Sequence, residues 1–428
     1  MLDFFKNINH VLWGFPIIIL LLFTHLYFTF RLHFVQKYTF RGIKLSVTPE
    51  NSSEKGFSSF GALSTTLAAT LGTGNIIGVS TAVVLGGPGA IFWCWITGIL
   101  GMATTYGECY LSLLFRRKGI KGTYYGGPMY VLEHGLHKKG LAVLYAFCVI
   151  CASFGVGCTT QSNSMADTLL YLWKIPPQVT GIVVSLFVGF VLIKGFSSIE
   201  KWCMKLVPFM SFLFLGASFL ILVINASFIL PGLLLIIRSA FSSSAVSGGV
   251  LGGALRYGIA RGLFTNEAGL GSAAIAAAAS NTQDIKRQAL ISATATFWDT
   301  VVMCAITGIV IVTNLLRNPI SIQGRNMGGL THAAFEVLPF GSFLLGICLL
   351  LFAFATLLGW SYFGQQAFLY LFQKKHLKIY QTAYMVFIFL GAVLSLDLVW
   401  EITDTLNIFM AVPNLISLYC LRKLLKSP

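Results

Sequence analysis

The chain has 428 residues, of which 56% are hydrophobic and 10% charged, and its formal net charge is +15. Soluble globular domains carry about 25% charged residues, so this composition excludes an ordinary soluble fold and indicates burial in a membrane. The basic charge does not indicate nucleic-acid binding either, because the sequence has no basic patch interleaved with aromatic residues.

Apolar stretches follow one another along the whole chain. Each reaches or approaches the roughly 20 residues that a helix needs to cross the hydrocarbon layer. They predict an all-α integral membrane protein with about eleven transmembrane helices. The first stretch is too long for a signal peptide and lacks a basic start and a small-residue cleavage site. The expected spans are roughly 10–32, 60–86, 90–115, 141–169, 178–196, 203–224, 251–277, 289–313, 341–371, 380–397 and 403–421.

The basic residues separate the two sets of loops. If the loop after the first span is cytoplasmic, loops and helix ends on that side hold most of the 29 Lys and Arg residues, from Arg31 to Lys55 onwards. This bias predicts an outside N-terminus and a cytoplasmic C-terminus in a plasma membrane, such as a bacterial inner membrane. The opposite side holds only Lys6, Lys174, Arg238, Arg317 and Arg325.

Spans two to six and seven to eleven form two sets of five helices. An odd number of helices per set places the sets in opposite orientations, as in transporters built from inverted repeats. We therefore expect an extra N-terminal helix and loop, two five-helix repeats with a connection between them, and a short tail. Their predicted limits are 1–59, 60–224, 225–250, 251–421 and 422–428.

Each set opens with a helix whose middle is rich in glycine. The first reads AATLGTGNIIG, with Gly72, Gly74 and Gly78, and the second reads RGLFTNEAGLGSAA, with Gly262, Gly269 and Gly271. Glycine costs about 1 kcal/mol against alanine inside a helix, so paired glycine clusters predict two broken helices facing a midplane binding site. Close helix packing is the alternative explanation for either cluster alone.

Polar side chains beside both glycine clusters favour the binding interpretation. Thr73 and Asn75 accompany the first cluster, and Asn266, Glu267 and Ser272 accompany the second. The ends of half-helices present free N–H groups to a carboxylate and free carbonyls to a cation or an ammonium group. Asn75 can both donate and accept hydrogen bonds, which suits a zwitterionic amino acid.

Further polar groups lie at membrane depth. Gln161 is a second amide that could bind substrate or another helix, and Trp360 could close over a small substrate or belong to an interfacial belt. Buried carboxylates are usually functional or paired. Glu267 could pair with Arg256 or Arg261 or couple to protons. Glu108 and Asp299 are the other two carboxylates within or close to the spans, and Glu108 could be merely interfacial.

No enzymatic motif is present. The chain has no HExxH, no P-loop and no GxSxG in a strand–turn–helix context, so we expect no catalysis and no cofactor other than a coupling ion. All nine cysteines fall within apolar spans, which argues against disulfides and zinc sites.

The sequence resembles the alanine or glycine:cation symporter family over nearly its whole length. The resemblance rests on GTGNI (72–76), GGPGAIFWCWITGILGM (86–102), GLFTNEAGLGSA (262–273) and FAFATLLGWSYFG (352–364). It implies two inverted five-helix repeats with discontinuous first helices, and sodium-driven uptake of alanine or glycine.

The resemblance also implies a binding site. Substrate would contact Gly72, Thr73, Gly74, Asn75, Gln161, Asn266, Glu267, Ala268, Gly269, Gly271 and Trp360. Sodium would lie among Ala68, Leu71, Phe352, Ala355 and Thr356.

Three positions depart from the family pattern. Ala355 stands where the family commonly has a second hydroxyl residue, which weakens the expected sodium site. Cys94 replaces a methionine of the FWxW signature, and Ala274 replaces a proline that often follows the GSA run.

We therefore predict a sodium-coupled symporter of a small neutral amino acid that works by alternating access in the lipid bilayer. A proton-coupled carrier, or one with an altered substrate, is the nearest alternative because of Ala355. A channel would need a continuous polar lining, and an amino-acid sensor would need an output domain, for which no soluble segment is large enough.

Overall fold

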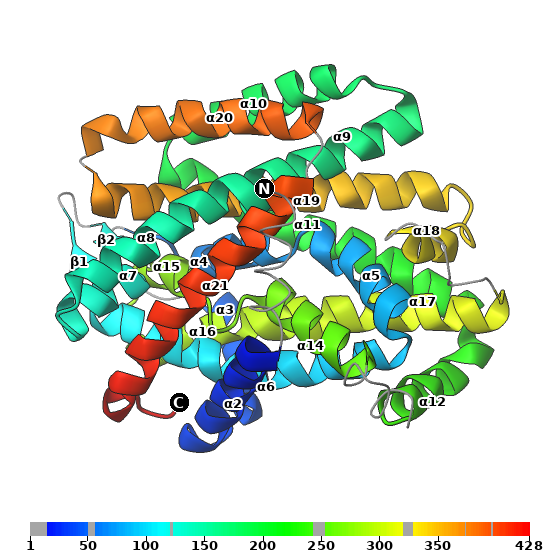
Figure 1. Cartoon of the computed structure of the whole chain (residues 1–428), viewed down its shortest axis with the longest axis horizontal. Coiled ribbons are helices and arrows are strands. Elements are labelled where there is room, and N and C mark those ends of the chain that lie inside the picture. Colours follow the sequence, from blue (N-terminus) through cyan, green and yellow to red (C-terminus); the bar gives the residue numbers. More distant parts are fainter. Residues whose placement is uncertain are drawn as a thin grey trace.

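The computed structural model describes residues 15–49, 56–119, 123–242, 253–319, 328–372, 374–394 and 397–428. Nearly all of these residues are helical (Figure 1). The main helices are α2 (Phe15–Arg31), α4 (Ser59–Thr70), α5 (Ile77–Gly86), α6 (Gly89–Leu114), α8 (Lys139–Phe154), α9 (Thr160–Trp173), α10 (Pro177–Ile193), α11 (Phe196–Ile224), α14 (Gly253–Asn266), α15 (Ser272–Ala278), α16 (Ile285–Thr296), α17 (Ala305–Arg317), α19 (Gly341–Leu371), α20 (Leu377–Val393) and α21 (Asp397–Cys420).

Short elements connect these helices. The only strands in the described ranges are β1 and β2, which pair antiparallel. The short elements are η1 (Val35–Tyr38), α3 (Thr39–Val47), η2 (Thr73–Asn75), β1 (Arg117–Lys118), β2 (Tyr124–Tyr125), α7 (Pro128–Tyr130), η3 (Val131–Gly135), η4 (Gly155–Thr159), η5 (Ala226–Phe228), α12 (Ile229–Ala240), η6 (Phe297–Cys304), α18 (Gly329–Phe335), η7 (Lys374–His376) and η8 (Arg422–Leu424).

The all-α membrane fold is confirmed, and each predicted span contains helix within the residues that the structure describes. Among the described residues, six helices are long and apolar enough to cross a membrane, or up to eight if each bent pair is one span. Three further apolar helices are shorter. Eleven crossings and the inverted repeats therefore stay predictions. Lys6, Lys55 and Arg325, which entered the charge argument, lie outside the described residues.

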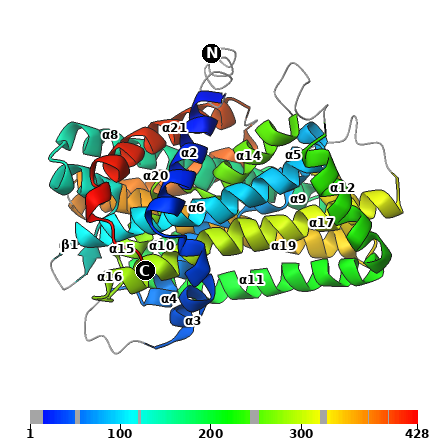
Figure 2. The ribbon, with the colours of Figure 1, turned by 90° about the horizontal axis from the view of Figure 1, so that it is seen from below.

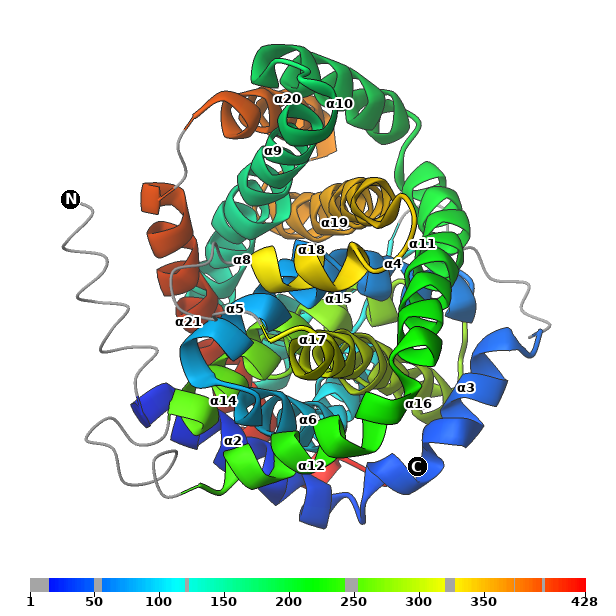
Figure 3. The same cartoon turned by 90° about the vertical axis from the view of Figure 1, so that its right-hand side faces the viewer.

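The two predicted helix breaks are present. The first separates α4 from α5, whose directions differ by 60°. The second separates α14 from α15 at residues 267–271. Seen along the long helices, α4, α5, α15 and α19 lie inside the bundle, with α10 and α20 on one side and α2, α3 and α12 on the other (Figure 3).

Two helices were not predicted. The connection expected at 225–250 contains α12, and the loop expected after the first span contains η1 and α3. Both helices are amphipathic and too short to cross a membrane, so a search for apolar spans of about 20 residues passes over them.

Candidate functional site

The first helix break is held open by its own side chains. Leu71 ends the hydrogen-bonded ladder of α4, and the Gly72 N–H donates to the Asn75 side-chain Oδ1 at 3.0 Å. A Cβ added to Gly72 would lie 2.9 Å from Thr356 Oγ1 and 3.6 Å from the Gln161 amide. Glycine is therefore needed where the backbone approaches α19 and α9.

Asn75 joins this break to η6. Its Nδ2 donates to Asp299 Oδ1 at 2.7 Å and to the Asp299 backbone carbonyl at 3.2 Å. Thr300 donates to the other Asp299 oxygen at 2.7 Å. All three residues are buried. The Asn75 amide is expected to face substrate, but in this structure its oxygen binds the Gly72 N–H and its nitrogen binds Asp299, so it fixes the shape of the break.

The second break follows Asn266. Glu267 adopts a left-handed conformation (φ 54°), and Gly269 and Gly271 have φ values of 97° and 80°. A non-glycine residue in this region is uncommon and costs energy, so it persists where surrounding contacts enforce it. Here the Glu267 carboxylate accepts a hydrogen bond from Ser272, and Asn266 Oδ1 accepts one from the Ala268 N–H at 3.0 Å.

Glu108 of α6 fixes the second break from outside. Its Oε1 accepts from the Gly269 N–H at 2.8 Å and from Asn414 Nδ2 at 2.6 Å. Asn414 also donates to the Gly269 carbonyl at 2.8 Å, and Tyr145 donates to the Leu270 carbonyl at 2.8 Å. The expectation that Glu108 could be merely interfacial is wrong, because the residue is buried and contacts the break directly.

The two carboxylates act across the predicted repeats. Asp299, in the helix after the second break, anchors the first break, and Glu108, in the helix after the first break, anchors the second. We call the Asp299–Asn75 and Glu108–Gly269 contacts the crossed anchors. Their partners lie 224 and 161 residues away in sequence, which is why sequence reasoning did not find them.

Gln161 and Trp360 close the remaining sides. Thr73 donates to Gln161 Oε1 at 3.3 Å, and Gln161 Nε2 donates to the Val156 carbonyl in the π-helical turn η4. Trp360 is buried, and its side chain packs so closely on Gly157 that a Cβ there would overlap it. Its side chain is buried and faces the Glu267 carboxylate, so Trp360 is not an interfacial belt residue.

The predicted sodium residues meet between α4 and α19. Thr356 Oγ1 lies 3.3 Å from the Leu71 carbonyl and 3.0 Å from the Phe352 carbonyl, donating to one or the other. Ala68, Phe352 and Ala355 are fully buried in the same core. Three oxygen atoms therefore converge at the end of α4, and oxygen is the ligand that hard cations prefer.

The arginine proposed as a Glu267 partner lies beside the first broken helix. A Cβ added to Gly78 would overlap the Arg261 guanidinium, and one added to Gly74 would lie 2.7 Å from it. The guanidinium also stands 5.2 Å from the Phe264 ring centre, and Arg256 lies 5.8 Å from the Tyr257 ring. Arg261 thus packs α14 onto α5.

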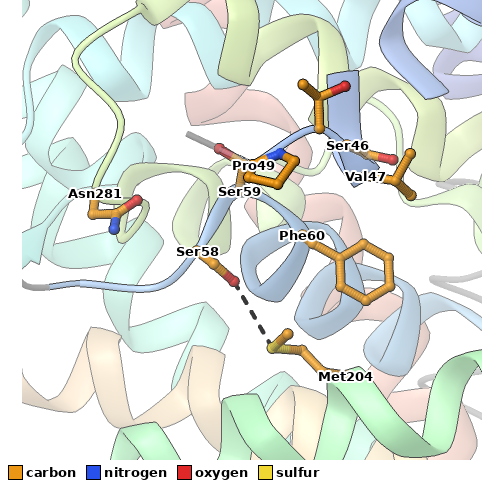
Figure 4. A pocket seen from close by; sticks show the side chains of 9 residues that line it. Ser46, Val47, Pro49, Ser58, Ser59, Phe60, Met204 and Asn281 are labelled. Carbon is orange, nitrogen blue, oxygen red and sulfur yellow. Dashed lines mark hydrogen bonds between the residues drawn. The ribbon is translucent and has the colours of Figure 1, made fainter. Parts of the chain in front are cut away.

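The site region is closed in this structure. Apart from the half-exposed Gly74, every residue predicted to bind substrate or sodium is buried. A cavity of about 380 Å³ lies elsewhere, at the start of α4, and Figure 4 shows Ser58 donating a hydrogen bond to Met204 in its lining. Beside it, the Ser58 N–H and hydroxyl donate to Glu200 Oε1 at 2.8 and 3.1 Å. These contacts hold the start of α4 against α11.

Known proteins match the chain over its full length. The model of the family described as "Sodium:alanine symporter family" matches residues 1–427. The sodium/alanine symporter AgcS of Methanococcus maripaludis is 44% identical, covering 97% of this chain and 94% of its own. The probable sodium/glutamine symporter GlnT of Bacillus subtilis is 35% identical, covering 97% and 87%.

A solved structure shares the fold. The crystal structure of MhsT in complex with L-phenylalanine superposes with a TM-score of 0.63 at 15% identity, covering 85% of this chain and 89% of that one. At this identity the likeness concerns the fold alone. Taken with the full-length family match, these findings identify the chain as a multi-pass membrane protein that belongs to the sodium:alanine symporter family.

Proposed function

We propose that the protein carries a small neutral amino acid, alanine or glycine, into the cell together with sodium by alternating access. The observation that carries the proposal is the pair of helix breaks, after Leu71 and after Asn266, at which backbone N–H groups and carbonyls lie outside a helical ladder. An amino acid needs both, because its carboxylate seeks donors and its ammonium group seeks acceptors.

The residues around the breaks support a small substrate. Gly72, Thr73, Gly74 and Asn75 would line one side, and Asn266, Glu267, Ala268, Gly269 and Gly271 the other, with Gln161 and Trp360 between them. The Trp360 side chain faces the Glu267 carboxylate, so these two residues would form one polar wall of the site. Trp360 packed against Gly157 leaves little room for a long side chain.

Sodium would bind at the end of α4, where Thr356 Oγ1 and the Leu71 and Phe352 carbonyls converge. Ala68 and Ala355 would complete the surroundings of the ion. Because Leu71 adjoins the substrate break, an ion held there would stabilise the same arrangement that substrate requires. This shared element accounts for coupling without a separate relay.

A proton-driven carrier is the competing proposal. Ala355 offers no hydroxyl oxygen to sodium, and Glu267 is a buried carboxylate beside the substrate region. The presence of a glutamine symporter among the relatives also makes the size of the substrate side chain worth testing.

Uptake of labelled alanine into proteoliposomes under separately imposed sodium and proton gradients tests the function. We expect accumulation only with an inward sodium gradient, and inhibition by unlabelled glycine more than by glutamine. Vesicles without protein give the background. Accumulation that ignores sodium and follows the proton gradient would overturn the sodium assignment.

Replacing Thr356 with alanine should raise the sodium concentration for half-maximal uptake by about tenfold, because one hydrogen-bonding oxygen contributes about 1 kcal/mol or more. Thr356→Ser keeps the hydroxyl and should stay near the parent value. Ala355→Ser, which adds an oxygen, should lower the sodium requirement. Equal sodium dependence in all three variants would remove this region from the ion site.

The arrangement in the membrane is proposed as well. The N-terminus would lie outside and the C-terminus in the cytoplasm of a plasma membrane, as the basic residues indicate. Residues 60–224 and 251–421 would form the two inverted repeats, flanked by the N-terminal region 1–59, the connection 225–250 and the tail 422–428.

A further inference from the structure

Helix α3 crosses the direction of the long helices. The chain turns by 65° between the helical segment that ends at Arg31 and the segment 35–47 that contains η1 and α3. In Figure 2, α3 lies at the edge of the bundle near the ends of α11 and α16, at a steep angle to α11; Figure 3 shows it on the outside. With nine residues α3 is too short to cross a bilayer, and its angle to the preceding helix suits a helix that lies along the membrane surface.

One face of α3 is fixed to α16. The small residues Thr39, Gly42 and Ser46 are buried, and a Cβ added to Gly42 would lie 2.8 Å from Thr294 Cγ2 and 3.0 Å from the Leu290 carbonyl. Arg287 of α16 donates to the Thr48 carbonyl at 2.9 Å and to the Leu45 carbonyl at 3.3 Å. These bonds satisfy carbonyls that the end of a helix leaves free.

The other face exposes apolar and basic side chains together. Phe40 is 81% exposed and Val47 is 69% exposed, although both are large hydrophobic residues. The basic residues of this segment that are exposed are Arg31, Lys37, Arg41 and Lys44, and residues 15–49 contain no Asp or Glu. Within the described residues, the acid associated with α16 is its N-capping residue Asp284, which accepts a hydrogen bond from the Arg287 backbone N–H at 3.0 Å.

We propose that this face of α3, formed by Lys37, Phe40, Arg41, Lys44 and Val47, binds the headgroups of anionic phospholipids. Its apolar side chains suit the acyl boundary, and its cations suit phosphate groups at the same depth. Unopposed positive charge beside exposed aliphatic and aromatic groups is the combination that interfacial helices use.

The contact would bear on transport because of what α16 carries. The helix continues into η6, where Asp299 anchors the first break. Lipid bound to α3 would stabilise the packing of α3 on α16, in which Arg287 donates to the carbonyls at the end of α3. We therefore infer that anionic lipid raises the transport rate as well as binding to the protein.

Lipid retention measures the proposal directly. The purified full-length protein is exchanged into detergent with equal amounts of phosphatidylglycerol and phosphatidylcholine, and bound lipid is counted by native mass spectrometry. Arg41→Gln with Lys44→Gln should lower phosphatidylglycerol retention by roughly 30-fold, since each cation near a membrane surface contributes about a fivefold effect. Retention of phosphatidylcholine should not change.

A matched pair of exposed cations provides the control. Lys375→Gln with Lys378→Gln removes the same charge near the start of α20 and should leave phosphatidylglycerol retention within twofold of the parent. In proteoliposomes, raising phosphatidylglycerol from none to about a third of the lipid should speed uptake by the parent and the control, but not by the α3 variant. Equal losses in both variants, or none, would overturn the proposal. Loss of a dimer instead of lipid would assign the face to a second copy.

Discussion

Replacing Asp299 with alanine should reduce sodium-driven alanine uptake by about 100-fold or more. Asp299 accepts hydrogen bonds from Asn75 at 2.7 Å and from Thr300 at 2.7 Å, and all three side chains are buried. A hydrogen bond contributes about 1 kcal/mol, and a buried donor left unpaired costs a further ~1–3 kcal/mol, which together account for a loss of this size. Initial uptake rates in proteoliposomes under a fixed sodium gradient measure the effect.

Asp299→Asn separates geometry from charge. Asparagine keeps an oxygen that can accept from Asn75, so it should retain more uptake than the alanine variant. Asn75→Ala should abolish alanine binding with expression intact. Adding Asp299→Ala to it should have little further effect, because the Asn75–Asp299 contact is already lost. Asp167→Ala, at an exposed position of α9, is the matched control and should be near normal. Normal uptake by Asp299→Ala would show that the first anchor is dispensable.

The breaks themselves were predictable because their cause is local. Glycine inside an apolar helix is unfavourable, and Gly72, Gly269 and Gly271 mark the points where the structure departs from helix. The predicted closeness of Thr73 and Gln161 is also seen. Predicting the breaks requires only the composition of one segment. Predicting that residues of different segments lie close requires, in addition, the expectation that those segments form one site.

The anchors were not predictable because their cause is distant. Glu108 and Asp299 were recognised as costly carboxylates at membrane depth, but the sequence does not place Gly269 beside one or Asn75 beside the other. Arg256 and Arg261 are the candidate partners of Glu267 in the sequence, and that pairing stays a prediction. In the structure a left-handed turn at Glu267 follows α14, and Arg261 lies against Gly74 and Gly78 of the first broken helix.

The crossed anchors suggest how the two breaks move together. The helix that anchors the first break follows the second break, and the converse also holds. A displacement of either broken helix therefore strains an anchor supplied by the other predicted repeat. Such reciprocity is what coupled binding of ion and substrate requires, since each ligand must stabilise a state shared by both sites.

Glu108→Ala tests whether the anchor of the second break affects alanine binding separately from sodium binding. Removing its carboxylate leaves the Gly269 N–H and Asn414 Nδ2 without their acceptor, so alanine affinity should fall by about 10- to 100-fold. The sodium requirement should change little, because the oxygens around Thr356 come from α19 and from Leu71 at the first break, none of them from the second break.

Isothermal titration calorimetry with alanine at several sodium concentrations gives the affinities for both ligands and so separates the effects of the two anchors. Asp299→Ala should lower the affinity for both sodium and alanine, whereas Glu108→Ala should lower the affinity for alanine alone. The alanine affinity of Glu108→Gln should lie between those of Glu108→Ala and the parent. Glu133→Gln, which alters a carboxylate bonded to Tyr370 away from both breaks, should bind normally. An equal loss of sodium and alanine affinity in Glu108→Ala would mean that the second break also shapes the ion site, and that the breaks behave as one rigid unit.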